Sequence, residues 1–127
     1  MPKKSTLGPA QRNAYYSAHE RCRETILGSI DRLRSRNREQ IDAGERAVND
    51  NEILSFKGDL HLHDAKKTAF DAENAAINPP TDAQLEALKN TLAKVERLTA
   101  NSRIAEEIVA LVKEGIGVFE QIQPSEQ

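Results

Sequence analysis

The six residues DLHLHD, at positions 59–64, hold the side chains best suited to chemistry in this 127-residue chain. They include two of its three histidines, and histidine together with aspartate can bind metals or move protons. On a β-strand, His61 and His63 would point to the same side and could share a metal ion. On an α-helix they lie about 200° apart and cannot. The segment therefore predicts direct metal binding only if it is a strand.

The surrounding residues favour a helix, and helical spacing gives these side chains another role. Asp59 and His63 are four residues apart, and His61 and Asp64 are three apart, so each pair can interact along one helix. A carboxylate beside a histidine favours the charged imidazolium, which predicts a turn that responds to mild acid. We interpret the segment as a solvent-facing polar turn, and we expect no catalytic, cofactor-binding or metal-binding residue in the chain. On this interpretation His63→Ala changes stability or its pH response and abolishes no reaction.

The third histidine, His19, lies three residues before Cys22, the only cysteine. A His/Cys cluster would form if these two residues packed beside the histidines of DLHLHD. With an antiparallel turn near residue 50, however, those histidines face residues 37–39, and together with Asp64 they approach the arginines at 36–38. His19 and Cys22 then face residues 78–81. This register predicts no cluster and makes Cys22 a small core residue.

The spacing of apolar residues predicts three helices. Apolar or small side chains recur at steps of three and four residues, which is the period of a helix face. The predicted helices run over about 9–48, 52–77 and 82–121, between a lead at residues 1–8 and a tail at residues 123–127. The second helix carries Ile, Leu and Phe on one side, and on another side it carries Leu62, Ala65, Ala69, Ala72 and Ala76.

Turn and cap signals separate these helices. Asn49-Asp50-Asn51 is rich in side chains that form turns. The two prolines that follow Asn78 cannot continue a helix interior. Thr81 and Gln84 match a capping box, in which each side chain bonds to the main-chain amide of the other residue. These signals predict where the second and third helices begin.

The expected fold is all-α: an antiparallel three-helix bundle over residues 9–122, with long outer helices and coiled-coil-like packing. Gly58 weakens the start of the second helix, which therefore begins near residue 52 or near residue 59. Long helices usually bury their apolar stripes against more than one neighbour. We therefore expect the bundle to form oligomers.

Composition and motifs exclude several classes of function. Hydrophobic residues make up 38% of the chain and charged residues 30%, which fits a folded helical domain better than a disordered chain. No run approaches the roughly 20 apolar residues of a membrane span. The lysines of MPKKSTLGPAQ precede no apolar run, which predicts a cytoplasmic protein, with leaderless export left open. The sequence shows no glycine-rich phosphate loop, nucleophile elbow or zinc-protease motif.

Two segments are candidates for binding a partner. The first 46 residues carry ten Lys and Arg against six Asp and Glu, whereas the remainder carries eight against fourteen. The basic segment has acidic residues nearby, and no aromatic residue is placed to stack on bases. Its candidate contact residues are four alternating arginines: Arg32, Arg34, Arg36 and Arg38. The other segment, residues 106–122, is amphipathic with an acidic polar face, which disfavours an anionic membrane. Its apolar candidates are Ile108, Val112, Ile116 and Phe119.

These features predict a non-enzymatic helical module for protein–protein interaction, such as an adaptor, a chaperone, an inhibitor of the antitoxin kind, or a component of phage or secretion assembly. We expect it to form a homo-oligomer, to bind a protein partner and to need no cofactor. The first alternative is a nucleic-acid-binding protein that uses the arginines of the first helix. The second is a metal-dependent enzyme or sensor built on DLHLHD.

Overall fold

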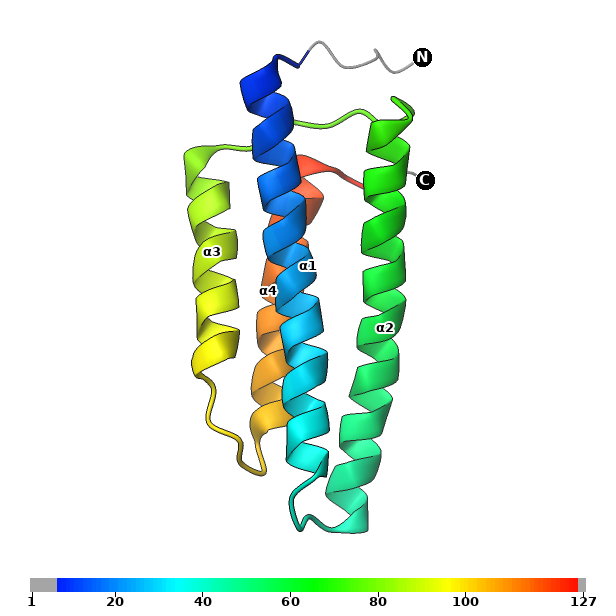
Figure 1. The fold of residues 1–127 in the computed structure, drawn as a ribbon, viewed down its shortest axis with the longest axis vertical. Helices are drawn as coiled ribbons and strands as arrows, with labels where there is room; N and C mark the ends of the chain where they lie inside the picture. Colours follow the sequence, from blue (N-terminus) through cyan, green and yellow to red (C-terminus); the bar gives the residue numbers. More distant parts are fainter. Residues whose placement is uncertain (1–6, 126–127) are drawn as a thin grey trace.

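The computed structural model describes residues 7–125, which form four helices (Figure 1). They are α1 (Pro9–Asn37), α2 (Ala43–Asp71), α3 (Asp82–Arg97) and α4 (Ile104–Ile122). Consecutive helices run in opposite directions, and α1 lies between α2 and α3 with α4 behind it. The all-α prediction is confirmed, and the prediction of three helices is wrong. Parts of the predicted lead (1–8) and tail (123–127) lie outside the described residues.

One helix, α1, organises the packing. It contacts each of the other three, whereas α2 contacts α4 only lightly and, over the described residues, does not contact α3. Buried apolar side chains from all four helices form one core. Within the described part of the chain, no helix combines the length and the hydropathy needed to cross a bilayer.

The predicted apolar stripe of the first helix is the centre of this core. Cys22 is 1% exposed, and burial raises the pKa of its thiol to about 12. A thiol with so high a pKa does not form the reactive thiolate at neutral pH. The prediction that Cys22 is a small core residue is confirmed. The buried apolar side chains of α1 are Tyr15, Ala18, Cys22, Ile26, Ile30 and Leu33.

The first turn lies at residues 38–42 and not at residues 49–51. Asp42 is the N-cap of α2, and its carboxylate accepts a hydrogen bond from the main-chain amide of Glu45 at 2.7 Å. Such a bond satisfies one of the amides that a helix start leaves without a partner. The second helix therefore begins at Ala43, earlier than either predicted start.

The three residues Asn49-Asp50-Asn51, which predicted a turn, lie within α2. The side chains of Asn49 and Asp50 bond across the hairpin to the end of α1. The amide group of Asn49 donates to Asn37 at 2.9 Å, and the amide group of Asn37 donates to Asp50 at 2.9 Å. Asparagine is a weak helix former, but here its side chain bonds to another helix and the main chain stays helical. The first helix ends at Asn37 and not near residue 48.

The predicted helix over 82–121 is two helices, because residues 98–103 form a turn. Within it, the side chain of Asn101 accepts a hydrogen bond from the amide of Arg103 at 2.8 Å. Short polar side chains of this kind compete with helical hydrogen bonds for the main chain. The turn folds α4 back against α3, and the two helices pack side by side.

The capping box is confirmed. The hydroxyl of Thr81 accepts from the amide of Gln84 at 3.1 Å, and the side chain of Gln84 accepts from the amide of Thr81 at 2.9 Å. Asn78, just before the two prolines, bonds to the C-terminal end of α4. Its main-chain amide donates to the carbonyl of Ile122 at 2.8 Å, and its side chain donates to that of Gln121 at 2.9 Å. The connection from α2 to α3 thus also closes the end of α4.

One residue at the end of α2 has a left-handed backbone. Glu73 has φ 58°, and its amide and that of Asn74 close the helix on the carbonyls of Phe70 and Ala69. Residues other than glycine reach this conformation at a cost of about 1 kcal/mol.

Glu73→Gly should therefore raise the free energy of unfolding by about 0.5–1 kcal/mol, because glycine adopts the left-handed conformation without strain. Urea unfolding followed by circular dichroism measures the change. Glu73→Ala removes the carboxylate but keeps the Cβ atom, so it should not stabilise the protein. An equal gain from alanine would show that the charge, and not the backbone, causes the effect.

Candidate functional site

His63 is buried against His19 and does not face solvent. The two side chains are 5% and 1% exposed, and their rings stack with centroids 3.8 Å apart at an interplanar angle of 8°. The Nε2 atom of each ring lies 2.8 Å from the main-chain carbonyl oxygen of the other histidine. Because a carbonyl oxygen only accepts, each Nε2 carries the proton and donates it. The pair thus forms two reciprocal hydrogen bonds between α1 and α2.

This pairing overturns the register predicted for DLHLHD. The turn at residues 38–42 brings His19 opposite His63, which a turn near residue 50 would have kept apart. Asp64 was expected near the arginines at 36–38, and instead it forms an ion pair with Arg23 at 3.0 Å. The prediction of a solvent-facing polar turn is therefore wrong for His63.

Burial keeps both histidines neutral. Phe119 of α4 packs edge-on against the two rings, with centroid distances of 4.6 Å to His63 and 5.5 Å to His19. Burial lowers the pKa of His63 to about 4 and also lowers the pKa of His19. Asp64 attracts a proton to both rings, but desolvation outweighs it. The expectation that a neighbouring carboxylate favours the imidazolium is thus reversed.

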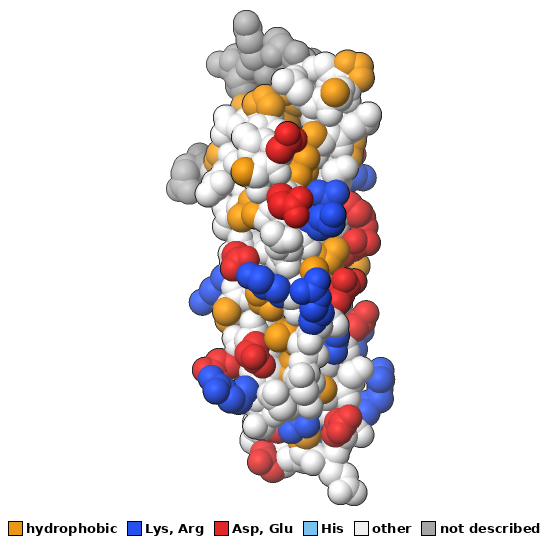
Figure 2. Space-filling view, turned by 90° about the vertical axis from the view of Figure 1, so that its left-hand side faces the viewer, with side chains coloured by type: hydrophobic (Ala, Val, Ile, Leu, Met, Phe, Trp, Pro, Cys, Tyr) orange, Lys and Arg blue, Asp and Glu red, His pale blue; other side chains and the backbone are white. Residues whose placement is uncertain are grey.

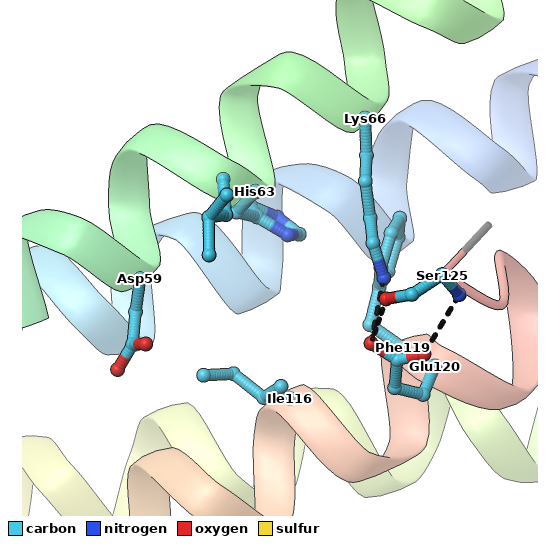
Figure 3. A pocket seen from close by; sticks show the side chains of 8 residues that line it. Asp59, His63, Lys66, Ile116, Phe119, Glu120 and Ser125 are labelled. Atoms are coloured by element: carbon cyan, nitrogen blue, oxygen red, sulfur yellow. Dashed lines mark hydrogen bonds and ion pairs between the residues drawn. The ribbon is translucent and has the colours of Figure 1, made fainter. Parts of the chain in front are cut away.

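A groove between α2 and α4 opens beside this pair (Figure 3). Lys66 crosses its rim and donates to Glu120 at 2.8 Å and to the main-chain oxygen of Gln123 at 2.9 Å. Asp59, at the other end, has no bonding partner among the described residues, and burial raises its pKa. The groove encloses about 100 Å³, less than the roughly 300–1,000 Å³ of a usual small-molecule site. Its walls include Leu62, His63, Ile116 and Phe119.

A second face of α2, which borders the groove at Leu62, is uncharged along most of its length. The residues on this face recur at alternating steps of three and four, and we call them the outer seam: Val48, Asn51, Ser55, Gly58, Leu62, Ala65 and Ala69. At about 100° per residue, Gly58 lies about 200° around the helix from Phe56 and about 140° from His63, both of which are buried. The helix α2 therefore has one face in the core and a second, uncharged face that is exposed from Val48 to Ala65 and partly covered at Ala69. At its C-terminal end this second face borders a hollow that residues 74–76 and 123–125 also line.

The outer seam gathers the exposed apolar surface of the protein. The large hydrophobic side chains that are exposed in the described part of the chain are Val48 (51%), Leu54 (66%) and Leu62 (65%). All lie on α2, two of them in the outer seam and Leu54 beside it. A three-and-four spacing over three heptads is the pattern by which one helix packs along another. Leu62 and the alanines share a helix face that is visible in the sequence, but the turn predicted at 49–51 concealed the first half of the seam.

The four arginines of the predicted basic surface have different surroundings. Arg32 donates to main-chain carbonyl oxygens at the end of α3, and Arg36 forms an ion pair with Glu45 at 2.6 Å. Arg34 and Arg38 are exposed. On the side where α3 lies, positive and negative side chains are interspersed (Figure 2). Half of the arginine run thus serves contacts within the chain.

The apolar candidates of residues 106–122 lie mostly in the core. Ile108, Val112 and Phe119 are 0%, 2% and 1% exposed. Ile116 is partly exposed and lines the groove beside α2. Over residues 7–125, no three His, Cys, Asp or Glu side chains are placed to hold a metal ion together.

The neutral histidine pair predicts that acid destabilises the fold. The unfolded chain binds a proton at His63 with a pKa near 6.5, and the folded chain does so only near 4. Protons therefore favour the unfolded state as the pH falls from 6.5 towards 4. His63 alone should remove about 2 kcal/mol by about pH 5, and the lowered pKa of His19 adds to this loss. Urea unfolding across the pH range measures it.

The matched comparison is between two histidines of the same helix. His63→Leu should remove its share of the pH dependence, whereas His61→Gln, at an exposed position, should retain the full slope. If both variants kept the slope of the unchanged protein, the titrating groups would lie elsewhere.

Replacing His63 by alanine should lower the free energy of unfolding by about 2–4 kcal/mol at neutral pH, because it removes a buried ring and the hydrogen bond that this ring donates to the carbonyl oxygen of His19. His61→Ala, at an exposed position, should cost less than about 0.5 kcal/mol. Denaturant titration at pH 7.5 compares them. Equal small losses would mean that His63 is not packed as described.

Comparisons of the chain with known protein families, with characterised proteins and with solved structures found no match. What the protein can do must therefore be inferred from its own residues. Three features stand out: the neutral pair His19–His63 that holds α2 on α1, the narrow groove between α2 and α4, and the uncharged outer seam.

Proposed function

We propose that the protein is a non-enzymatic module for protein–protein interaction and that the outer seam of α2 is its binding surface. The observation that carries this proposal is the position of the exposed large hydrophobics, Val48, Leu54 and Leu62, which all lie on one helix. Scattered apolar side chains are normal on a protein surface, whereas exposed large apolar side chains that gather on one helix favour a contact site.

The physical basis is the free energy of removing apolar surface from water. Full burial of one Leu or Val side chain contributes roughly 1.5–3 kcal/mol. Small residues between the large ones, such as Ser55 and Gly58, allow a second backbone to approach closely. The spacing suits a helix that packs along α2 in coiled-coil fashion.

The histidine pair supports this role by fixing the orientation of α2. Because α2 contacts α4 only lightly, its position depends mainly on α1. The bonds between His19 and His63 resist rotation of α2 about its own axis, which would turn Leu62 inwards. An adaptor, a chaperone, an inhibitor or an assembly component would use such a surface, in the cytoplasm and without a cofactor.

A photo-crosslinking residue tests the surface directly. Placed at position 54 or 62, in the cells that make the protein, it should yield covalent products with another chain. The same residue at Gly117, an exposed position of α4, should yield none, because that face carries charged neighbours and no apolar row. Leu62→Lys should abolish the product formed from position 54. Absence of products at 54 and 62, or equal products at 117, would contradict the proposal.

A further inference from the structure

We propose that the outer seam binds the outer seam of a second copy of this chain, with the two α2 helices antiparallel. This inference rests on the proposed function, that the seam binds a helix, and adds the identity and direction of that helix. The seam runs from Val48 to Ala69, about 32 Å at 1.5 Å per residue. Two copies of such a row form a self-complementary interface of the kind that twofold dimers use.

The side chains of the seam from Asn51 to Ala69 fit one antiparallel register, whereas Val48 falls opposite Ala72, the C-cap of α2. When Leu62 of one copy lies against Gly58 of the other, a twofold axis passes near residue 60. In the same register Ala65 meets the second copy's Ser55, and Ala69 meets its Asn51. At the twofold axis a large side chain thus meets a glycine, and beyond it small side chains meet, so that the two helices can pack closely without a cavity.

Two helix-interior glycines, Gly58 and Gly117, have open space where a side chain would lie, and Gly58 is the one in the outer seam. A glycine in a helix interior costs about 1 kcal/mol relative to alanine. A Cβ atom at Gly58 would meet no other atom within 4 Å, so the chain's own fold leaves room for a side chain there. Contact with Leu62 of a second copy would fill that space.

Charges beside the seam favour the antiparallel direction. Glu52, Asp59 and Lys66 recur at seven-residue intervals on the edge that faces α4. In the antiparallel register Glu52 of each copy meets Lys66 of the other. Lys66 can accommodate this, because its bonds to Glu120 and to the main chain use two of its three N–H donors. In a parallel pair, Lys66 would lie opposite His61 and the attraction would be lost.

The same register places the two copies of Asp59 near each other at the twofold axis. Like charges at close range repel, so this residue opposes the dimer at neutral pH. Asp59→Asn should therefore strengthen self-association severalfold, and Glu52→Lys should weaken it. In a parallel pair, Asp59 would lie opposite Leu54. Asp59→Asn would then not strengthen self-association, and Glu52→Lys would not weaken it.

Sedimentation equilibrium from about 1 to about 300 μM tests the dimer, since modest helix–helix contacts dissociate in that range. The unchanged protein should give the mass of two chains at the upper end. Gly58→Ala should raise the dissociation constant about tenfold while favouring the helix itself. Gly117→Ala is the matched control, since a Cβ atom there also meets nothing within 4 Å, and it should leave the dissociation constant unchanged. Circular dichroism checks that each variant is folded.

Single cysteines test the direction of the helices. Mild oxidation should link two copies of His61→Cys, because position 61 lies at the twofold axis. It should not link two copies of Val48→Cys, whose cysteines lie near opposite ends of the pair. The unchanged protein is the background control, because Cys22 is 1% exposed. Linkage at 48 without linkage at 61 would overturn the antiparallel arrangement.

Failure of this inference is distinguishable from failure of the proposed function. A protein that stays monomeric to about 300 μM, while photo-crosslinkers at 54 and 62 capture a different chain, overturns the dimer and leaves the binding surface standing. A monomer whose seam captures nothing overturns both.

Discussion

Two hydrogen bonds between imidazole rings and main-chain carbonyls fix the position of α2. Each ring of the His19–His63 pair donates to the other residue's carbonyl oxygen at 2.8 Å. One turn away, Tyr15 stacks on Phe70 with ring centroids 3.9 Å apart. The Tyr15 hydroxyl donates to the side chain of Gln123 at 2.6 Å, which ties the end of α4 to the same place. The orientation of α2, and therefore the set of side chains that it exposes to solvent, depends on these contacts.

As a consequence, one face of α2 packs on α1 and a second face is exposed to solvent. A helix in a four-helix bundle usually has two neighbours, but α2 relies mainly on α1. Its second uncharged face therefore remains exposed over most of its length, and Figure 1 shows α2 at the edge of the molecule. The narrow groove near His63 follows from the same geometry, because α2 and α4 meet only lightly along it. Both surfaces would change if α2 rotated, so the histidine pair links stability to the proposed binding.

Local signals were predictable from the sequence, and tertiary ones were not. The capping box of Thr81 involves residues three positions apart, so its chemistry is visible in the sequence. Asn49 was predicted to form a turn because asparagine is common in turns. Its actual hydrogen-bond partner, Asn37, lies on another helix and could not be identified from the sequence. That error moved the turn from residues 38–42 to residues 49–51 and placed His63 opposite residues 37–39, which hid its meeting with His19. One signal was available, because His63 lies midway in a seven-residue repeat between the core residues Phe56 and Phe70.

The central claim is that two neutral histidines, each donating from Nε2, hold α2 in place. Nitrogen-15 spectra of the imidazole groups at about pH 6, in protein labelled at histidine, test it most directly. The account predicts that both rings are neutral, that each carries its proton on Nε2, and that these protons exchange slowly with water. A charged ring at that pH, or a proton on Nδ1 of either histidine, would contradict it.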